Sequence, residues 1–180
     1  MTSDYITPQE CDDLILALPQ EYRPIVICAA ETGFRIGDLC RAMWTDYDIQ
    51  EQTLTLVEDK TGKVRTAAVT PRLKMALEAQ RARQSCFEIY IFPGRDMCKP
   101  VSRVTVWRWI KRTWAHMFPG NERIISPHSM RKMYAVERRK SGAEIWEIQQ
   151  DFNHDRDSTT IKYAFADILG REPRYLLKDL

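Results

Sequence analysis

The chain has 180 residues and a mass of 21.1 kDa, which suits one packed domain and leaves little room for two. With 44% hydrophobic and 29% charged residues, and only 7 glycines and 9 prolines, the composition excludes disordered and collagen-like classes. The net charge of +2 divides into −8 over residues 1–60, +13 over residues 61–140 and −3 over residues 141–180. So basic a middle segment favours a polyanionic partner, nucleic acid above all.

Capping signals and periodicity predict three helices in the first quarter of the chain. The run Thr7-Pro8-Gln9-Glu10 is typical of a helix start, because Thr7 can cap, Pro8 suits the first turn and Glu10 stands three residues after the cap. Gly33 provides a stop for an almost wholly apolar second helix. The three helices are expected over residues 7–18, 24–31 and 36–43.

A hairpin follows. Residues 53–57 alternate between threonine and apolar side chains, and residues 64–69 can return as the partner strand. Between them Lys60-Thr61-Gly62-Lys63 has the composition of a turn. The sequence therefore predicts a hairpin whose tip carries two lysines.

The rest of the chain predicts helices and one short strand. The helix over 102–118 has one apolar face and one basic face, and Ser158 is expected to cap the last helix. Five helices are expected over residues 71–84, 102–118, 126–140, 143–152 and 158–163, and the strand over residues 89–92. The chain is thus predicted to be one mainly α domain with a small antiparallel β-sheet, an α+β fold, over residues 1–180, ending in a tail at about 171–180.

The termini and the cysteines indicate the compartment. No run of about 18 apolar residues occurs, and the first ten residues lack a basic segment, so neither a membrane span nor a signal peptide is predicted. The cysteines are odd in number and include no CxxC pair, which favours reduced packing residues. We therefore expect a cytoplasmic protein. The cysteines are Cys11, Cys28, Cys40, Cys86 and Cys98.

Metal and nucleotide signatures are not found in the sequence. Its three histidines fit neither HExxH nor a cysteine-histidine site, and its glycines fit neither GxGxxG nor a phosphate-binding loop. Asp155 and Asp157 are interpreted as turn residues. We predict no metal and no cofactor.

One short pattern points to anion binding. In His128-Ser129-Met130-Arg131 the i,i+3 spacing places the histidine and the arginine on one face near the start of a predicted helix. Free N–H groups and the helix dipole favour a phosphate there, and an arginine fork adds two charge-assisted hydrogen bonds. Alone, the pattern is more typical of a surface histidine and an ion-paired arginine than of an anion site.

Further boxes give the pattern a context. Thr32-Gly33-Phe34-Arg35-Ile36-Gly37-Asp38-Leu39, followed by Trp44-Thr45-Asp46, resembles the first arginine box of tyrosine recombinases, especially integrases of the phage lambda type. Lys60-Thr61-Gly62, the His128 to Arg131 box, Asn153-His154 and Tyr163 then follow in family order. The resemblance covers roughly residues 7–168. It implies the tyrosine recombinase catalytic-domain fold.

The resemblance implies a site-specific recombinase that cleaves and rejoins DNA strands through a covalent 3′-phosphotyrosyl intermediate, without metal or ATP. Tyr163 would be the nucleophile, Arg35 and Arg131 would grip the phosphate, and Lys60 would be the acid for the leaving 5′ oxygen. Lys63 is the rival acid.

Other residues would assist. The resemblance makes His128 an acid/base assistant and His154 a hydrogen-bond donor to the phosphate, and we interpret Asp38 as a structural partner of the arginine region. We expect DNA contacts from basic residues outside this cage, namely Lys63, Arg65, Arg103, Arg108, Lys111, Arg112 and Lys132.

The family also implies partners and neighbours. The expected partner is double-stranded DNA in a bacterial or phage-infected cell. The protein is expected to bind this DNA as a tetramer and can be monomeric when free. Accessory DNA-bending proteins are compatible with this assembly. We expect no N-terminal core-binding domain, so the chain is read as an excised catalytic domain or a short recombinase. The tail at 171–180 would dock on a neighbouring protomer or pack in cis. Asp155-Arg156-Asp157 and Lys132-Met133 depart from the usual family residues.

Three alternatives remain open at this level. A non-enzymatic DNA-binding relative would keep the fold without turnover. A topoisomerase or telomere resolvase would use similar residues for a related reaction. An unrelated small helical interaction protein would show neither DNA affinity nor a cluster of Arg35, His128 and Arg131.

Overall fold

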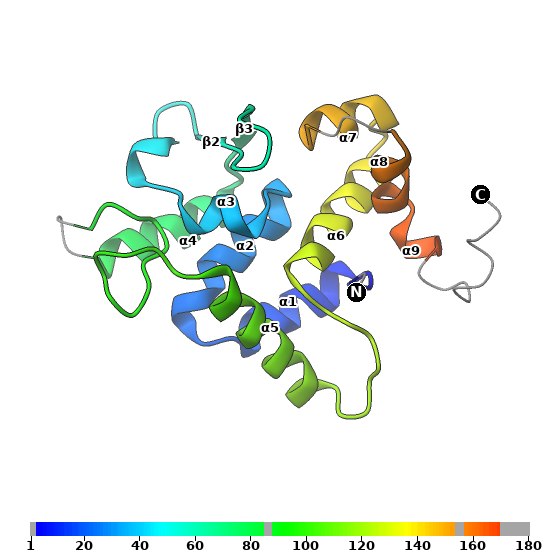
Figure 1. Cartoon of the computed structure of the whole chain (residues 1–180), viewed down its shortest axis with the longest axis horizontal. Coiled ribbons are helices and arrows are strands. Elements are labelled where there is room, and N and C mark those ends of the chain that lie inside the picture. The colour runs from blue at the N-terminus through cyan, green and yellow to red at the C-terminus, as the bar shows by residue number, and fades with distance from the viewer. Residues whose placement is uncertain (1–2, 85–87, 154–156, 170–180) are drawn as a thin grey trace.

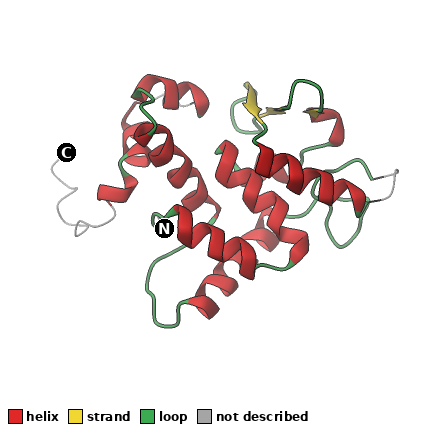
Figure 2. Cartoon of the chain, turned by 180° about the vertical axis from the view of Figure 1, so that it is seen from behind, coloured by secondary structure: helices red, strands yellow, loops and turns green. Residues whose placement is uncertain are grey.

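A computed structural model of the chain describes residues 3–84, 88–153 and 157–169, with the side chains of residues 157 and 158 left out. The described part is mainly helical with a small sheet at one end, as predicted (Figures 1 and 2). Within it, no helix combines the length and apolar character needed to cross a membrane. The elements are α1 (Pro8–Ala17), η1 (Gln20–Tyr22), α2 (Arg23–Thr32), α3 (Ile36–Cys40), η2 (Trp44–Asp46), β1 (Tyr47–Asp48), β2 (Thr53–Val57), β3 (Val64–Ala68), α4 (Pro71–Ala82), α5 (Arg103–Met117), α6 (Pro127–Lys140), α7 (Ile145–Asp151), α8 (Asp157–Ala164) and α9 (Ala166–Leu169).

The predicted helix start at the N-terminus is confirmed. The Thr7 hydroxyl accepts a hydrogen bond from the Glu10 amide, and the Glu10 carboxylate accepts one from the Thr7 amide at 3.0 Å. This capping box satisfies two N–H groups that the helix itself cannot. Arg123, which precedes α6, pairs with the same carboxylate, so the start of α1 is also tied to a distant segment.

The sheet has three antiparallel strands in the order β1-β2-β3. In the β2–β3 hairpin, Thr53 lies opposite Ala68 and Val57 lies opposite Val64. Leu54 and Leu56 turn one face of β2 into the core, and the other face is open to solvent. The lysine-bearing tip thus projects from a sheet that is anchored on one side only.

Two apolar clusters hold the molecule together. The larger one is built around α2, whose residues are buried over most of its length, and α2 packs against α4 and α6. The smaller one consists of Ala135, Ile148, Phe152 and Ala164, and Tyr163 packs against it. Because Met130 and Met133 of α6 belong to the first cluster and Ala135 to the second, α6 joins the two.

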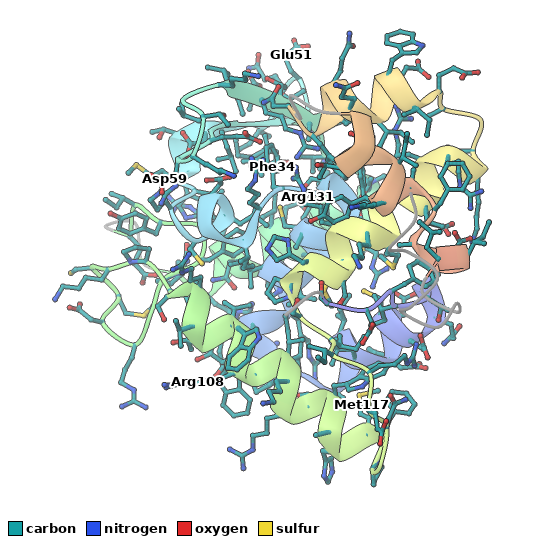
Figure 3. All side chains as sticks on the ribbon, turned by 45° about the vertical axis from the view of Figure 1, so that its right-hand side comes forward. Phe34, Glu51, Asp59, Arg108, Met117 and Arg131 are labelled. Carbon is teal, nitrogen blue, oxygen red and sulfur yellow. The ribbon has the colours of Figure 1, made fainter. Side chains whose placement is uncertain are left out.

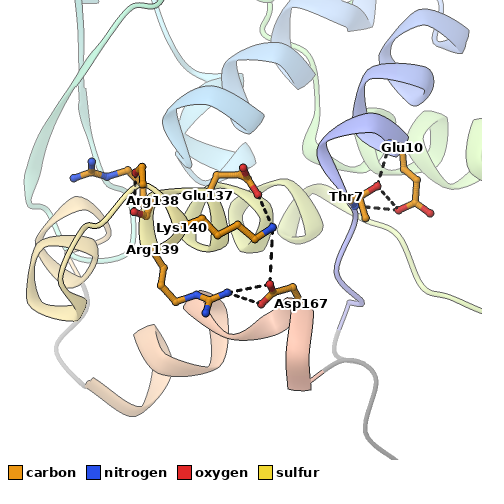
Figure 4. A network of polar contacts seen from close by, with 8 residues as sticks. Thr7, Glu10, Glu137, Arg138, Arg139, Lys140 and Asp167 are labelled. Atoms are coloured by element: carbon orange, nitrogen blue, oxygen red, sulfur yellow. Dashed lines mark hydrogen bonds and ion pairs between the residues drawn. The ribbon is translucent and has the colours of Figure 1, made fainter.

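Ion pairs fasten the last helix to α6. Both carboxylate oxygens of Asp167 accept hydrogen bonds from Nη2 of Arg139, at 3.0 and 2.9 Å, and Lys140 lies 3.9 Å from the same carboxylate (Figure 4). Lys140 also pairs with Glu137 at 3.1 Å. The network holds α9, and through it the end of α8, beside α6.

Some predictions differ from the structure. The strand expected over 89–92 is wrong: Tyr90 makes a single bridge to Met43, because the segment lies beside the short connection between α3 and η2 and not beside another strand. The helix expected over 158–163 is α8, which begins at Asp157, so Ser158 is not its cap. Cys11, Cys28 and Cys40 are buried and free, as predicted, but Cys98 is exposed and does not pack. Cys86 and the predicted tail at 171–180 lie outside the described residues.

Candidate active site

One cavity of about 440 Å³ collects the positively charged side chains that the sequence singled out. It lies where the hairpin tip, α3 and the start of α6 meet, and Phe34, Asp59 and Arg131 mark this junction in Figure 3. The chain thereby brings together residues almost one hundred positions apart. Its lining includes Phe34, Arg35, Ile36, Gly37, Asp38, Asp59, Lys60, Arg103, Pro127, His128 and Arg131.

Arg35 stands at the sharp turn between α2 and α3. Gly33 ends α2 in the left-handed conformation with φ 64°, and Arg35 is the residue that precedes the first turn of α3. The guanidinium is partly exposed to the cavity, and its Nη1 lies 2.5 Å from a carboxylate oxygen of Glu58. The acidic partner of Arg35 is therefore Glu58, and not Asp38.

Arg131 is almost fully buried, at 2% exposure, and its head is fixed on three sides. Its Nη1 donates to the Gly33 carbonyl, its Nη2 donates to the Phe152 carbonyl at 3.1 Å, and its Cζ lies 3.9 Å from the centre of the Phe152 ring. Burial, reinforced by the charges of Arg35 and Arg65, lowers the pKa of Arg131 to about 9. A pKa of that value still leaves the guanidinium charged at neutral pH, with a strong tendency to attract an anion.

His128 lies one turn before Arg131, on the cavity side of α6. Ser126 caps this helix by accepting a hydrogen bond from the His128 amide at 3.2 Å, and Pro127 occupies the first turn. Partial loss of water lowers the pKa of His128, and the charges of Arg131, Arg35 and Lys132 lower it further. The side chain remains partly open to solvent. Both causes favour the neutral imidazole.

The hairpin tip carries Lys60 to the rim of the cavity. The tip is tied to α3 because the Asp59 amide donates to Oδ1 of Asp38 at 3.1 Å, and the same oxygen accepts from Arg41 at 3.0 Å. Asp38 is 5% exposed and supports the arginine region through the hairpin and Arg41, not through Arg35. Lys60 lines the cavity, and Lys63 is not among the lining residues.

Tyr163 lies on α8, next to this set. Its ring meets the Phe152 ring edge-on, with centroids 5.9 Å apart and planes at 74°. Phe152 is the ring that carries the Arg131 guanidinium on its face, and Tyr163 is close enough to influence the Arg131 pKa. The remaining predicted member, His154, lies outside the described residues.

The predicted DNA-contacting cations divide into two groups. Arg103, Arg108, Lys111 and Arg112 are exposed on α5, and Lys63 is exposed near the hairpin tip. The other two predicted residues, Arg65 and Lys132, make contacts within the protein that do not fit a role in DNA binding. Arg65 is 6% exposed and donates to the Thr32 carbonyl, because it lies opposite Leu56 on the inner face of the hairpin. Lys132 donates to the Ser3 carbonyl at 2.5 Å and is half-buried.

The structure adds two functional residues that the sequence reasoning missed. Glu58 neutralises part of the charge of Arg35, and Phe152 provides both a carbonyl and a ring for Arg131. A signal for Glu58 existed: the alternation of Leu54 and Leu56 places Glu58 on the buried face of the strand. An acid on a buried face calls for a cationic partner. No comparable signal marks Phe152, because its carbonyl meets Arg131 only in the fold.

The side chains of the site are suited to binding an anion such as a phosphate. Arginine, lysine and histidine side chains face one cavity, and its two carboxyl-bearing lining residues, Asp38 and Asp59, belong to the hairpin and α3 connection. Within the described ranges, no three His, Cys, Asp or Glu side chains gather closely enough to hold a metal ion.

Known proteins give the arrangement a context. Tyrosine recombinase XerA of Pyrococcus furiosus is 28% identical over 164 residues, an alignment covering 88% of this chain and 56% of XerA. A crystal structure of XerA recombinase superimposes with a TM-score of 0.79 at 24% identity, covering 99% of this chain and 64% of that one. The chain thus spans little more than half the length of this relative.

Lambda integrase shares the fold as well. Its dimer bound to a COC′ core site superimposes with a TM-score of 0.76 at 22% identity, covering 96% of this chain and 50% of that one. Its tetramer bound to a Holliday junction gives a TM-score of 0.72 at 21% identity, covering 88% and 48%. The family model described as "Phage integrase family" matches residues 4–168. The chain belongs to the phage integrase family, the tyrosine recombinases.

Proposed function

We propose that this chain performs the strand cleavage and strand joining of a site-specific tyrosine recombinase acting on double-stranded DNA. The observation that supports it most is the shared cavity: Arg35, Lys60, His128 and Arg131 come from three separate segments and line one space. Tyr163 packs beside it, against the ring that carries Arg131. Together these residues would bind a DNA phosphate between a nucleophile, Tyr163, and an acid, Lys60.

The two arginines would bind the non-bridging oxygens of the scissile phosphate. A guanidinium presents parallel N–H donors that fit such oxygens, and it stays charged throughout the reaction. Arg131 is held by two carbonyls and an aromatic ring, so it meets the phosphate already oriented. Fixed donors of this kind stabilise charge that develops in the transition state, typically by about 10²–10³ in rate for each donor.

Tyr163 would attack the phosphorus atom through its hydroxyl oxygen. The new bond joins this oxygen to phosphorus, the bond from phosphorus to the 5′ oxygen breaks, and a 3′-phosphotyrosyl link remains. Ionising a phenol at neutral pH costs about 4 kcal/mol, and the arginine charges near Tyr163 would offset part of this cost. The departing 5′ oxygen would take a proton from Lys60. Joining would reverse the steps, with a 5′ hydroxyl of another strand as nucleophile.

His128 would accept the phenolic proton that Tyr163 releases as its oxygen attacks, and the family resemblance assigns His154 as a hydrogen-bond donor to the phosphate. The lowered pKa of His128 favours the neutral ring at pH 7, and a neutral imidazole can both donate and accept a hydrogen bond. Lys60 is favoured over Lys63 as the acid because Lys60 lines the cavity.

The assembly on DNA is part of the same proposal. Lambda integrase forms a dimer on a core site and a tetramer on a Holliday junction, and we propose a tetramer for this chain on DNA as well. The exposed cations of α5 would lie along the phosphate backbone next to the cavity. Arg108 projects from this helix in Figure 3.

Covalent trapping tests the proposal. The full chain is incubated with nicked duplexes tiled across the DNA that flanks its gene, then denatured in detergent and run on a gel. We expect a slower protein–DNA band with the wild-type chain. Tyr163→Phe should lose the band and retain DNA binding, because only the attacking oxygen is removed.

A matched variant controls for the loss of any tyrosine hydroxyl. Tyr22→Phe keeps the ring that stacks on Trp109 and should retain the covalent band. A band formed by Tyr163→Phe would assign the nucleophile elsewhere. DNA binding without a band in the wild type would instead favour the non-enzymatic relative.

A further inference from the structure

Glu58 is a buried acid with no place in the reaction described above. It follows β2 directly, at the base of the hairpin tip, and is 1% exposed. Leaving a carboxylate out of water is costly unless hydrogen bonds and opposite charges compensate. The compensation that the structure provides shows what this residue does.

The contacts of Glu58 reach in two directions. Its Oε2 lies 2.5 Å from Nη1 of Arg35, which lines the cavity, and also accepts a hydrogen bond from the Thr61 hydroxyl at 2.8 Å. Thr61 directly follows Lys60 in the chain. One carboxylate oxygen therefore touches both the phosphate-gripping arginine and the loop that presents the lysine.

The main chain of Glu58 closes the same loop. Its amide donates to the Lys63 carbonyl at 2.9 Å, and its carbonyl accepts from the Gly62 amide at 2.8 Å. The neighbouring Asp59 amide donates to Asp38 of α3. The tip from Glu58 to Lys63 is thus closed on itself and joined to the α3 region through Arg35 and Asp38. The position of Lys60 relative to Arg35 depends on these joints.

Glu58 is charged under ordinary conditions. Burial opposes the charge, but hydrogen bonds from Arg35 and Thr61 and the charges of Arg35 and Arg131 outweigh it, so the pKa of Glu58 is below its usual value. The carboxylate could either hold Arg35 in place or compete with DNA phosphate for it. The bond to Thr61 favours the first reading, because a mere competitor for Arg35 would not need to brace the lysine loop.

We propose that Glu58 is a positioning residue that couples the phosphate grip of Arg35 to the delivery of the Lys60 proton. This inference rests on the proposed function, in which Lys60 protonates the leaving oxygen. Loss of the coupling would leave phosphate binding largely intact and misplace the acid. The expected defect is therefore specific to the protonation of the leaving group.

A substrate with sulfur in place of the 5′ bridging oxygen isolates that step. A thiolate leaves without a proton near neutral pH, whereas an alkoxide does not. Cleavage of the bond from phosphorus to sulfur still needs Tyr163 and the arginines, but no longer needs the acid. Such a substrate should restore variants that lack the acid or misplace it, and should not restore variants that lack the grip.

The test compares rates of covalent adduct formation by the full chain on matched oxygen and sulfur duplexes. Glu58→Gln should be roughly 10- to 100-fold slower than wild type on oxygen, the scale expected for a group displaced by about 1 Å, and close to wild type on sulfur. Lys60→Ala should behave likewise. Arg35→Ala should be slow on both. Glu51→Gln makes the same charge change at an exposed position just before β2 and should match wild type on both.

Several results would overturn the inference. A Glu58→Gln chain that is equally slow on both substrates would place the defect in the phosphate grip or the fold. If Glu58→Gln is faster than wild type on the oxygen substrate, Glu58 competes with the DNA phosphate for Arg35 and does not position it. Failure of sulfur to restore Lys60→Ala would instead refute the proposed acid itself, and that failure appears in a different variant.

A second measurement needs no DNA and no activity. We expect hydrogen exchange at the Gly62 amide to be faster in Glu58→Gln than in wild type, because the tip loses its charged tie to Arg35. Exchange in α2 should be unchanged in that variant, as evidence of an intact fold, and Glu51→Gln should leave the Gly62 amide unchanged. Unaltered exchange at Gly62 in Glu58→Gln would show that Glu58 does not hold the tip.

Discussion

Two buried arginines are stabilised by neighbouring main-chain oxygens. Arg65 donates to the Thr32 carbonyl and Arg131 to the Gly33 carbonyl, at the C-terminal end of α2. This end of a helix carries partial negative charge, which favours cations. The faces of Phe34 and Phe152 add cation–π contacts, at 4.3 Å from Arg65 and 3.9 Å from Arg131. These contacts offset part of the cost of burying the positive charge of the two arginines.

Partial burial of His128 and the cations around it give stability a pH dependence that can be measured. The pKa of His128 in the folded chain is below its ordinary value of 6.5. The unfolded chain therefore binds more protons as the pH falls through this region, and the free energy of unfolding should fall with it. The stabilisation is complete above about pH 7 and is lost below about pH 6.5 as the pH approaches the lowered pKa.

His128→Gln removes this titration and keeps a polar side chain. We expect the difference in unfolding free energy between pH 7.5 and 5.5, measured by urea denaturation, to be smaller in His128→Gln than in wild type. His116→Gln provides the control, because His116 is exposed at the far end of α5. An equal pH dependence in His128→Gln and wild type would contradict the electrostatic description of the site.

The turn between α2 and α3 leaves no room for a side chain at Gly33. A Cβ at Gly33 would lie 2.7 Å from Cδ1 of Tyr134 and 2.8 Å from Cε1 of Phe152. The residue also has a positive φ of 64°, a conformation that costs about 1–2 kcal/mol for a residue with a Cβ. Both rings belong to the region that supports Arg131, so strain there reaches the site.

Gly33→Ala should destabilise the fold by more than about 2 kcal/mol, because the contact with the two rings adds to the backbone cost. It should also slow strand cleavage, since its carbonyl orients Arg131. Gly120→Ala isolates the backbone cost: its φ is 79° and no atom lies within 4 Å of the added Cβ. Thermal unfolding of both variants tests the difference, and equal losses would mean that the rings move aside at no cost.

Local signals predicted elements well where the chain itself carries the cause. The Thr7 cap, the Gly33 stop and the hairpin are confirmed because caps, glycines and alternation act over a few residues. The prediction of a strand over 89–92 was wrong because apolar character cannot distinguish a strand from a buried extended segment. Its side chains at Ile91 and Phe92 are buried, yet no neighbouring strand is present among the described residues.

At the scale of the whole molecule, the site is a product of tertiary contacts. The shared sequence motifs predicted one site made of Arg35, Lys60, His128, Arg131, His154 and Tyr163. The first four line the same cavity, Tyr163 is not among its lining residues, and His154 lies outside the described residues. The groups that hold these side chains in place could not be predicted from the motifs. The Gly33 and Phe152 carbonyls reach Arg131 across sequence separations of 98 and 21 residues, which no local pattern specifies.

The distribution of exposed cations over the whole molecule determines where DNA would bind. The basic segment at 61–140 is not uniformly available, since Arg65 and Lys132 are held by main-chain carbonyls. The cations of α5 are exposed, and Arg103 at its start lines the cavity. If one DNA phosphate occupies the cavity, the next phosphates along the strand would therefore lie beside α5. The number of cations engaged sets the salt dependence of binding.

Removing Arg108 and Lys111 should weaken DNA binding similarly for all sequences and flatten its salt dependence. Each lost phosphate contact reduces the magnitude of the negative slope of log K against log salt by about 0.9, so Arg108→Ala with Lys111→Ala should reduce it by nearly 2. Fluorescence anisotropy over a salt series measures the slope. Arg72→Ala is the control, because Arg72 already pairs with Asp12 at 2.7 Å. A slope unchanged by the α5 double variant would move the DNA path off this helix and leave the hairpin tip and the start of α6 as its remaining contacts.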